Sequence, residues 1–238
     1  MIHHLTIADA FPASVLDFVG TGDLSLGIDI GTTEGKKSNP SAFALTEDLG
    51  LTKALRLGAR FKTGQKDVLV GVLDRILTLC ENRGSKLKVA VLDATNERLT
   101  AVEVVQDFAG RLTVRLALLG TTRLVFGEKV TLKTYICGLV TSHLEDGRLL
   151  LPAAEWITKD FRQMVREKGG FTSAVAEDGA HADLFIATGL SLDGHDMSGP
   201  AEAAAVPTSS WGASKPSDDD DDDEPKGFGA WLLGQLGF

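Results

Sequence analysis

The stretch Leu26-Gly27-Ile28-Asp29-Ile30 is the most informative part of this sequence for its fold. It is a short apolar run of the kind that forms a buried strand, and Asp29 stands in it between two isoleucines. A carboxylate placed beside residues that must be buried costs several kcal/mol unless a cation or a hydrogen-bond partner compensates. Because a residue inside a strand has no free helix N–H groups to cap, helix capping does not explain Asp29.

Two more aspartates stand where apolar runs stop. Asp93 closes Val89-Ala90-Val91-Leu92, and Asp183 lies in His181-Ala182-Asp183-Leu184-Phe185. Taken singly, Asp93 could cap the helix that follows it, and Asp183 could pair with a nearby cation. Three such acids in distant elements instead indicate a divalent metal site. Mg²⁺ and Mn²⁺ prefer hard oxygen ligands, which aspartates supply.

Hydrophobic spacing predicts three strands in a row and then strands alternating with helices. This order predicts an α/β fold, with a mixed central sheet flanked by helices. The expected strands are residues 24–30, 41–45, 52–61, 87–92, 112–118 and 148–151, and the expected helices are 65–81, 97–108, 124–144, 153–166 and 180–192.

Composition divides the chain of 238 residues into three parts. We expect an N-terminal arm or linker over residues 1–22, one α/β domain over 23–197 and a disordered acidic tail with an apolar tip over 198–238. The tail holds two lysines against eight acids, a charge of −6. The whole chain carries −9, which leaves only −3 for the rest. The low pI of about 5.0 therefore says little about whether the domain binds nucleic acid.

The two cysteines, Cys80 and Cys137, lie in apolar helical stretches and are expected to be buried thiols in a reducing compartment. The N-terminus lacks a basic segment followed by an apolar one, as a signal peptide would have. No apolar run reaches the roughly 18 residues of a membrane helix. We expect a cytoplasmic protein with no membrane partner.

Four segments together resemble the C-terminal nuclease domain of viral large terminases, in the ribonuclease-H-like superfamily. They are Leu26–Gly31, Val89–Thr95, Gly147–Pro152 and Gly179–Ala187, and the resemblance covers roughly residues 24–194. It implies a ribonuclease-H-like nuclease domain that cuts concatemeric viral DNA, a bacteriophage genome for example, during packaging. The implied partners are double-stranded DNA, the packaging motor ATPase and the portal.

The resemblance also implies roles for the acids. Asp29 would bridge two Mg²⁺ or Mn²⁺ ions, with Asp93 on one ion and Asp183 on the other. Two such ions about 4 Å apart can activate a water and stabilise the leaving oxygen of a phosphodiester. His181 precedes Asp183 by two residues, so on a helix it would point elsewhere, toward DNA or a shared water.

Five cations are candidates for phosphate contacts, although each is equally an ordinary surface residue. Such contacts position a duplex without reading its sequence. The candidates are Lys36, Lys37, Arg98, Arg123 and Lys129.

Residues 31–38 look like a phosphate-binding P-loop, but the spacing between the glycines is one residue short and the segment leads into a hairpin rather than a helix. Without another such motif, the sequence predicts an excised domain or a nuclease subunit whose motor is a separate chain. Three rival classes remain open. Gly27–Thr33 resembles the first phosphate loop of sugar kinases and actin, although Asp93-Ala94-Thr95 lacks the glycine of their second loop. A Holliday-junction resolvase would use the same acids, and a non-enzymatic DNA mimic or scaffold would use only the tail.

The C-terminal tip follows the acidic run Asp218–Glu224. Phe228, Trp231, Leu232 and Leu236 share one face at helical spacing, which suits a short helix docking in a partner's groove. The terminal Phe238 could dock as well. The expected partner is the motor, the portal or another phage protein, and the aspartates could also compete with DNA for the basic surface of the domain.

Overall fold

The computed structural model describes residues 22–31, 40–63, 65–167, 169–174 and 181–196. These residues belong to the first of two units, Met1–Ala201, and the second unit is Glu202–Phe238. The predicted N-terminal arm (apart from Gly22) and the predicted acidic tail with its apolar tip lie outside the described residues. Among the described residues, no helix is long and apolar enough to cross a membrane.

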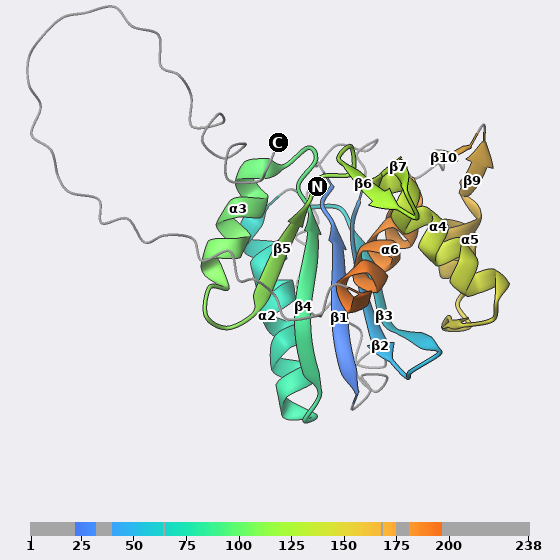
Figure 1. Ribbon diagram of the computed structural model, residues 1–238. Helices are drawn as coiled ribbons and strands as arrows, with labels where there is room; N and C mark the ends of the chain where they lie inside the picture. Colours follow the sequence, from blue (N-terminus) through green and yellow to red (C-terminus); the bar gives the residue numbers. More distant parts are fainter. Residues whose placement is uncertain (1–21, 32–39, 64, 168, 175–180, 197–238) are drawn as a thin grey trace, which may run out of the picture. The chain divides into compact units, whose positions relative to one another are not determined.

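A six-stranded mixed sheet forms the centre of the domain, in the order β5-β4-β1-β2-β3-β8 (Figure 1). The first three strands pair as antiparallel neighbours, whereas β4 and β5 continue the sheet in parallel beside β1. The short β8 pairs in parallel with β3 at the other edge. The strands are β1 Asp23–Asp29, β2 Ser41–Asp48, β3 Lys53–Phe61, β4 Lys86–Asp93, β5 Thr113–Ala117 and β8 Leu149–Leu150.

Helices cover both faces of the sheet and enclose two hydrophobic cores. One core packs the sheet against α2 (Lys66–Asn82) and α3 (Arg98–Asp107). The other packs it against α4 (Leu132–Glu145), α5 (Glu155–Arg162) and α6 (Asp183–Asp196). Because strands with both faces covered need apolar residues at nearly every position, the continuous apolar runs of β1 and β4 follow from this arrangement.

The central strand β1 sends alternate residues to the two cores. Leu24, Leu26 and Ile28 face the core beneath α2 and α3. Gly27 faces α6, where a Cβ would lie only 1.8 Å from the carbonyl oxygen of Ala187. A side chain at this position would push the helix off the strand, so the glycine allows α6 to lie directly against the middle of the sheet.

Helix α6 is buried on nearly every side, from Asp183 through Gly194. A helix that is apolar all round belongs in the core of a protein, and α6 packs on β1, β2 and β4 as well as on α4. The predicted final helix thus exists. It extends four residues beyond the predicted end at Leu192.

Two predicted helices are wrong in part because they contain β-hairpins. The expected helix 124–144 begins only at Leu132, since β6 (Thr122–Val125) and β7 (Glu128–Thr131) pair before it. The expected helix 153–166 ends at Arg162, and β9 (Met164–Glu167) then pairs with β10 (Gly170–Ser173). In the first case a turn with positive φ at both Phe126 and Gly127 reverses the chain, and the Thr131 side chain caps α4.

Candidate active site

Asp29 and Asp93 end two neighbouring parallel strands. Ile28 of β1 is in register with Leu92 of β4, so the next residues, Asp29 and Asp93, stand side by side. Neighbouring strands lie about 4.8 Å apart, and residues in register point to the same face. The two carboxylates therefore lie at the same end of the sheet and on the same face.

Helix α6 lies on that same face and runs antiparallel to β1. Ala187 meets Gly27, and one turn later the hydroxyl of Ser191 donates to the carbonyl oxygen of Ser25 at 2.7 Å. In the other direction, one helical turn leads back from Ala187 to Asp183, and two strand residues lead from Gly27 to Asp29. Both steps cover about 5–7 Å, so the start of α6 places Asp183 over Asp29.

The electrostatics of Asp29 agree with this placement. Its pKa is raised well above the ordinary value, first by burial and then by the negative charges of Asp93, Asp183 and Asp160. The Lys133 ammonium acts in the opposite direction. The structure therefore brings three sequence-predicted acids together with a fourth.

Asp93 is held by the backbone that follows it. One oxygen, Oδ1, accepts hydrogen bonds from the backbone N–H of Thr95 at 2.8 Å and from its hydroxyl at 2.5 Å. Burial nevertheless raises the pKa of Asp93. The residue that precedes α3 is Glu97, with no side-chain cap hydrogen bond, so the alternative in which Asp93 caps that helix is wrong.

Asp183 is the first residue of α6 and is also buried. Its Oδ2 accepts from the backbone N–H of His181 at 3.0 Å. Burial raises the pKa of Asp183 to about 6, and the neighbouring charge of Asp160 adds to the shift. The preceding residue, Ala182, has a φ of 62°, a conformation that a non-glycine residue adopts only at a cost. The side chain of His181 is partly exposed beside this turn, and its chemical role stays a prediction.

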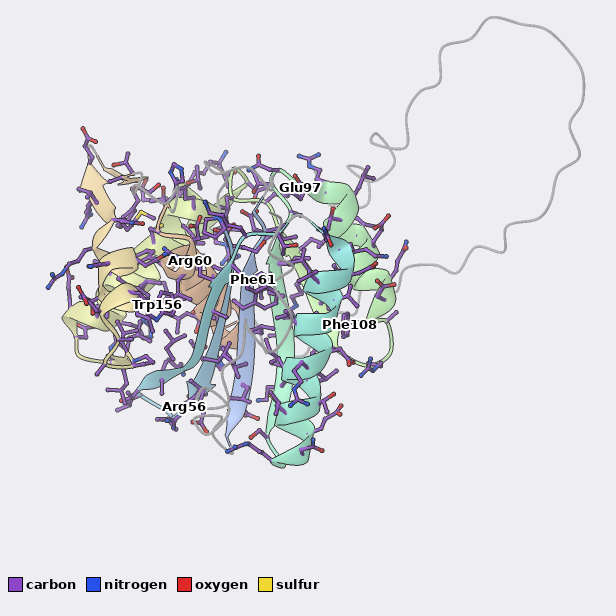
Figure 2. All side chains as sticks on the ribbon, turned by 180° about the vertical axis from the view of Figure 1, so that it is seen from behind. Arg56, Arg60, Phe61, Glu97, Phe108 and Trp156 are labelled. Carbon is purple, nitrogen blue, oxygen red and sulfur yellow. The ribbon has the colours of Figure 1, made fainter. Side chains whose placement is uncertain are left out.

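The fourth acid, Asp160 of α5, was not among the predicted residues. It is fully buried; its Oδ1 accepts from the backbone N–H of Phe185 at 3.0 Å, and Arg60 Nη1 donates to Oδ2 at 3.3 Å. The guanidinium carbon of Arg60 also lies 5.8 Å from the ring centroid of Trp156, and both residues are labelled in Figure 2. The sequence held one signal for Asp160: an acid on the face of α5 that also carries Ile157 and Phe161.

Helix α5 thereby holds the start of α6. Asp160 accepts from the N–H of Phe185, and Gln163, the residue after α5, accepts through Oε1 from the backbone N–H of Ala182 at 2.8 Å. These two acceptors satisfy N–H groups that a helix start leaves without partners, at a place where Ala182 has no polar side chain. The position of Asp183 therefore depends on α5.

Lys133 is a cation of the site that was also missed. It lies in the first turn of α4, where its backbone N–H donates to the carbonyl oxygen of Leu119 at 3.0 Å. Its charge acts against the rise in pKa of both Asp29 and Asp93. No spacing in the sequence joins Lys133 to these aspartates, because only the fold brings them together.

The cations predicted to contact phosphate differ in where the structure places them. Arg123 lies within the domain: Nη1 donates to Asp193 of α6 at 2.6 Å, and the guanidinium sits 4.5 Å from the Tyr135 ring centroid. Its charge is thus engaged internally. Arg98 and Lys129 are exposed. The remaining candidates lie outside the described residues, as do the predicted partner-binding side chains of the tail: Lys36, Lys37, Phe228, Trp231, Leu232, Leu236 and Phe238.

The donor chemistry of the site fits an oxygen-preferring cation, since every acid in it is an aspartate. Cys137 is no competing ligand, because burial raises the pKa of its thiol to about 12. Across the described part of the chain, no three His, Cys, Asp or Glu side chains stand in an arrangement that could hold a metal ion. Asp93 and Asp183 each turn one oxygen to a backbone N–H instead.

A mixed sheet with this strand order, with carboxylates at the ends of β1 and β4 and at the start of a late helix, has the ribonuclease-H-like fold. Among solved structures it is similar to the nuclease domain of the large terminase subunit of bacterial virus Sf6, in a mutant form with manganese. That match has a TM-score of 0.53 and 11% sequence identity, and it covers 78% of this chain and 95% of the other. The predicted fold class and the resemblance to terminase nuclease domains are confirmed at the level of the fold.

Two further solved structures are of the same kind. The large terminase nuclease domain of Thermus phage P74-26 has a TM-score of 0.48 and 15% identity, over 75% of this chain and 92% of that one. The human cytomegalovirus terminase nuclease domain, soaked with Mn and bound to an inhibitor, has a TM-score of 0.46 and 11% identity, over 77% and 87%. No protein-family model matches the sequence, and a search of curated proteins found no match.

Proposed function

We propose that this protein is a metal-dependent DNA endonuclease of the terminase type, which cuts concatemeric viral DNA during genome packaging in the cytoplasm of the host cell. One observation carries the proposal: Asp29, Asp93 and Asp183 lie near one another at one end of a ribonuclease-H-like sheet, although they come from elements far apart in the sequence. Their burial is costly, and a bound cation would offset that cost.

The three aspartates would hold Mg²⁺ or Mn²⁺, after Asp93 and Asp183 turn from the backbone groups that they now contact. When bound, two such ions supply an activated water and stabilise the oxygen that leaves a cleaved phosphodiester. The solved relatives in complexes with manganese or calcium support the use of a divalent cation. Asp29 would bridge the ions, because it lies between Asp93 on the neighbouring strand and Asp183 on the helix above.

The other residues of the site position these ligands. Thr95 fixes Asp93 through two hydrogen bonds, and Asp160 with Gln163 fixes the start of the helix that carries Asp183. Lys133 places a positive charge beside Asp29 and Asp93, where it would attract the phosphate that is to be cut.

The direct test is digestion of supercoiled plasmid DNA by the full chain with Mg²⁺ or Mn²⁺, with and without chelator. We expect cleavage that stops when the chelator is added, and none from Asp29→Asn. Asp74→Asn is the matched control, because Asp74 is an exposed acid of α2 whose pair with Arg111 lies on the opposite face of the sheet. Cleavage by Asp29→Asn at the wild-type rate would refute the proposal.

Cleavage of synthetic four-way junctions and linear duplexes under the same conditions distinguishes the proposed function from a junction resolvase. A marked preference for a four-way junction over linear duplex would favour a junction resolvase. We propose linear duplex DNA as the substrate, with the packaging motor and the portal as protein partners. The C-terminal tail is the proposed docking segment, and deletion of residues 218–238 should raise nonspecific DNA binding at low salt if its aspartates compete with DNA.

A further inference from the structure

The hairpin β6–β7 presents an apolar tip to solvent. Phe126 is fully exposed, and Leu124 is 70% exposed. Phe126 also has a φ of 50°, in the left-handed region that glycine or asparagine occupies readily and a bulky aromatic residue rarely does. The tip therefore combines two costs, an unburied aromatic ring and a strained backbone, and the fold itself recovers neither of them.

The base of the hairpin is held firmly. On its inner face, Arg123 pairs with Asp193 of α6 and lies over the ring of Tyr135 of α4. Next to the base, the N–H of Leu132 donates to the carbonyl oxygen of Thr121 at 2.7 Å. The tip is thus fixed in place relative to the helix that carries Asp183.

The hairpin leaves the sheet at the end of the strands that carries the aspartates. It follows β5, whose last residue, Ala117, is in register with Asp93, and it leads into α4, where Lys133 acts on Asp29 and Asp93. Figure 1 shows β6 and β7 at the end of the sheet toward which β4 and β5 point. The hairpin therefore lies toward the same end of the sheet as the aspartates, where a duplex with a phosphate at the site would approach.

The outer face of the hairpin suits such a duplex. Lys129 stands opposite Leu124 on that face, and both are exposed. The one acid of the hairpin, Glu128, is paired with Val125 and so belongs to the other face. An apolar wedge beside a cation is a combination that inserts between base steps of a duplex while contacting its backbone.

We propose that the hairpin β6–β7 is a DNA-binding device of this protein: Phe126 inserts between base pairs of the duplex and Lys129 contacts a phosphate. This inference rests on the proposed nuclease function and adds to it the element that grips the substrate beside the cut. It differs from the sequence-based expectation, in which Arg123 contacted DNA, because Arg123 anchors the hairpin from behind.

The test measures DNA binding by the full chain with Ca²⁺ in place of Mg²⁺, on a duplex that carries 2-aminopurine, whose fluorescence rises when the base is unstacked. A gel of the recovered duplex shows that it is uncut. Wild-type protein should raise the fluorescence, and Phe126→Ala should lose that rise and weaken binding by about 5- to 50-fold, as expected for loss of a stacked aromatic contact. Lys129→Gln should keep the rise and reduce the slope of log affinity against log salt by about 1.

Two further variants test whether the loss of binding comes from lower stability or from the removal of any exposed apolar side chain. Phe126→Asn relieves the positive φ, so it should melt no lower than the wild type and still lose the fluorescence rise. Leu51→Ala removes another strongly exposed apolar side chain (86%) at the β2–β3 turn, at the opposite end of the sheet, and should bind as the wild type does.

The outcomes distinguish the two proposals. If the wild type cleaves DNA but Phe126→Ala binds and unstacks it normally, the hairpin proposal is overturned and the nuclease stands. If the wild type binds and unstacks DNA but never cleaves it with any divalent ion, the hairpin proposal stands and the nuclease fails. If Phe126→Ala loses affinity with no unstacking by the wild type, the wedge is refuted.

Discussion

The two ends of α6 both bury polar groups, and they do so in opposite ways. At its C-terminal end several buried groups are paired: Thr46 Oγ1 lies 2.6 Å from Ser191 Oγ and 2.9 Å from His195 Nε2, and Asp193 pairs with Arg123. Burial there lowers the pKa of His195, which favours the neutral ring. At the N-terminal end, Asp183 and Asp29 face other carboxylates, and their pKa values are raised.

The difference shows which polar cluster serves the fold and which serves chemistry. Buried polar groups that are paired stabilise a specific packing, as the hydroxyls and the histidine do. Carboxylates gathered in one place oppose folding unless cations compensate, and although Lys133 and Arg60 act on these groups, the pKa values of Asp29 and Asp183 stay raised. Such perturbed groups in one place are typical of functional sites.

The largest loss should follow Asp160→Ala. This change removes the buried carboxylate that Arg60 Nη1 contacts and the acceptor for the Phe185 N–H, which together should cost about 3–5 kcal/mol in the free energy of unfolding. Chemical denaturation measures this cost. Arg60→Met removes the ion pair with Asp160 while keeping an apolar side chain of similar length. Glu155→Ala is the matched control, because Glu155 is an exposed acid on the same helix. An equal loss of stability in Asp160→Ala and Glu155→Ala would show that α5 does not act through Asp160.

Asp29→Asn should act in opposite directions on stability and on cleavage. Without divalent metal at pH 7.5 it removes one of several repelling carboxylates, so the variant should be more stable than the wild type, by on the order of 1–3 kcal/mol. The same change should abolish cleavage. Thermal melting in chelator measures the first effect; a variant that melts below the wild type would mean that Asp29 is a structural residue.

The contribution of Asp183 to the stability of the metal-free protein should favour low pH. A raised pKa in the folded state means that the folded protein binds the proton more tightly than the unfolded chain does. The stability contribution of Asp183 is therefore fully present below about pH 4 and is lost as the pH rises through about 6. Melting curves in chelator from pH 4.5 to 7.5 measure it. Asp183→Asn should flatten this dependence, and saturating Mg²⁺ or Mn²⁺ should offset the loss at high pH.

The smallest effect should come from the C-terminal end of α6. Thr46→Val removes the hydroxyl shared by Ser191 and His195 and should cost about 1–2 kcal/mol, since one buried hydrogen-bond partner is lost. Cleavage measured at a temperature well below the melting point should be unchanged. A loss of cleavage in this folded variant would show that the two ends of α6 are not separate in function.

Much of this site could be predicted from sequence because its signals are local. Asp29 and Asp93 interrupt or close apolar runs, and an acid there has few structural explanations. Asp160 gave a weaker signal, since one acid on a short helix is ordinary until the helix is seen to pack on α6. Lys133 gave none, because its link to the aspartates exists only in three dimensions.

The errors in the fold have the same origin. Residues 124–144 contain enough apolar residues at helical spacing to predict one helix, but the turn at Phe126-Gly127 requires positive φ at a phenylalanine, which no sequence rule anticipates. Arg123 was expected to contact DNA because it is a cation near a strand end. Its true partner, Asp193, is 70 residues away in the sequence.

The central claim is that Asp29, Asp93 and Asp183 together bind divalent cations. Diffraction from crystals soaked in Mn²⁺, recorded near the manganese absorption edge, tests it most directly. We predict two anomalous peaks about 4 Å apart between these three carboxylates in the wild type, with at least one absent in Asp29→Asn. Well-ordered crystals at saturating Mn²⁺ with no peak among the three carboxylates, or with Asp29 more than about 10 Å from either of the others, would contradict the account.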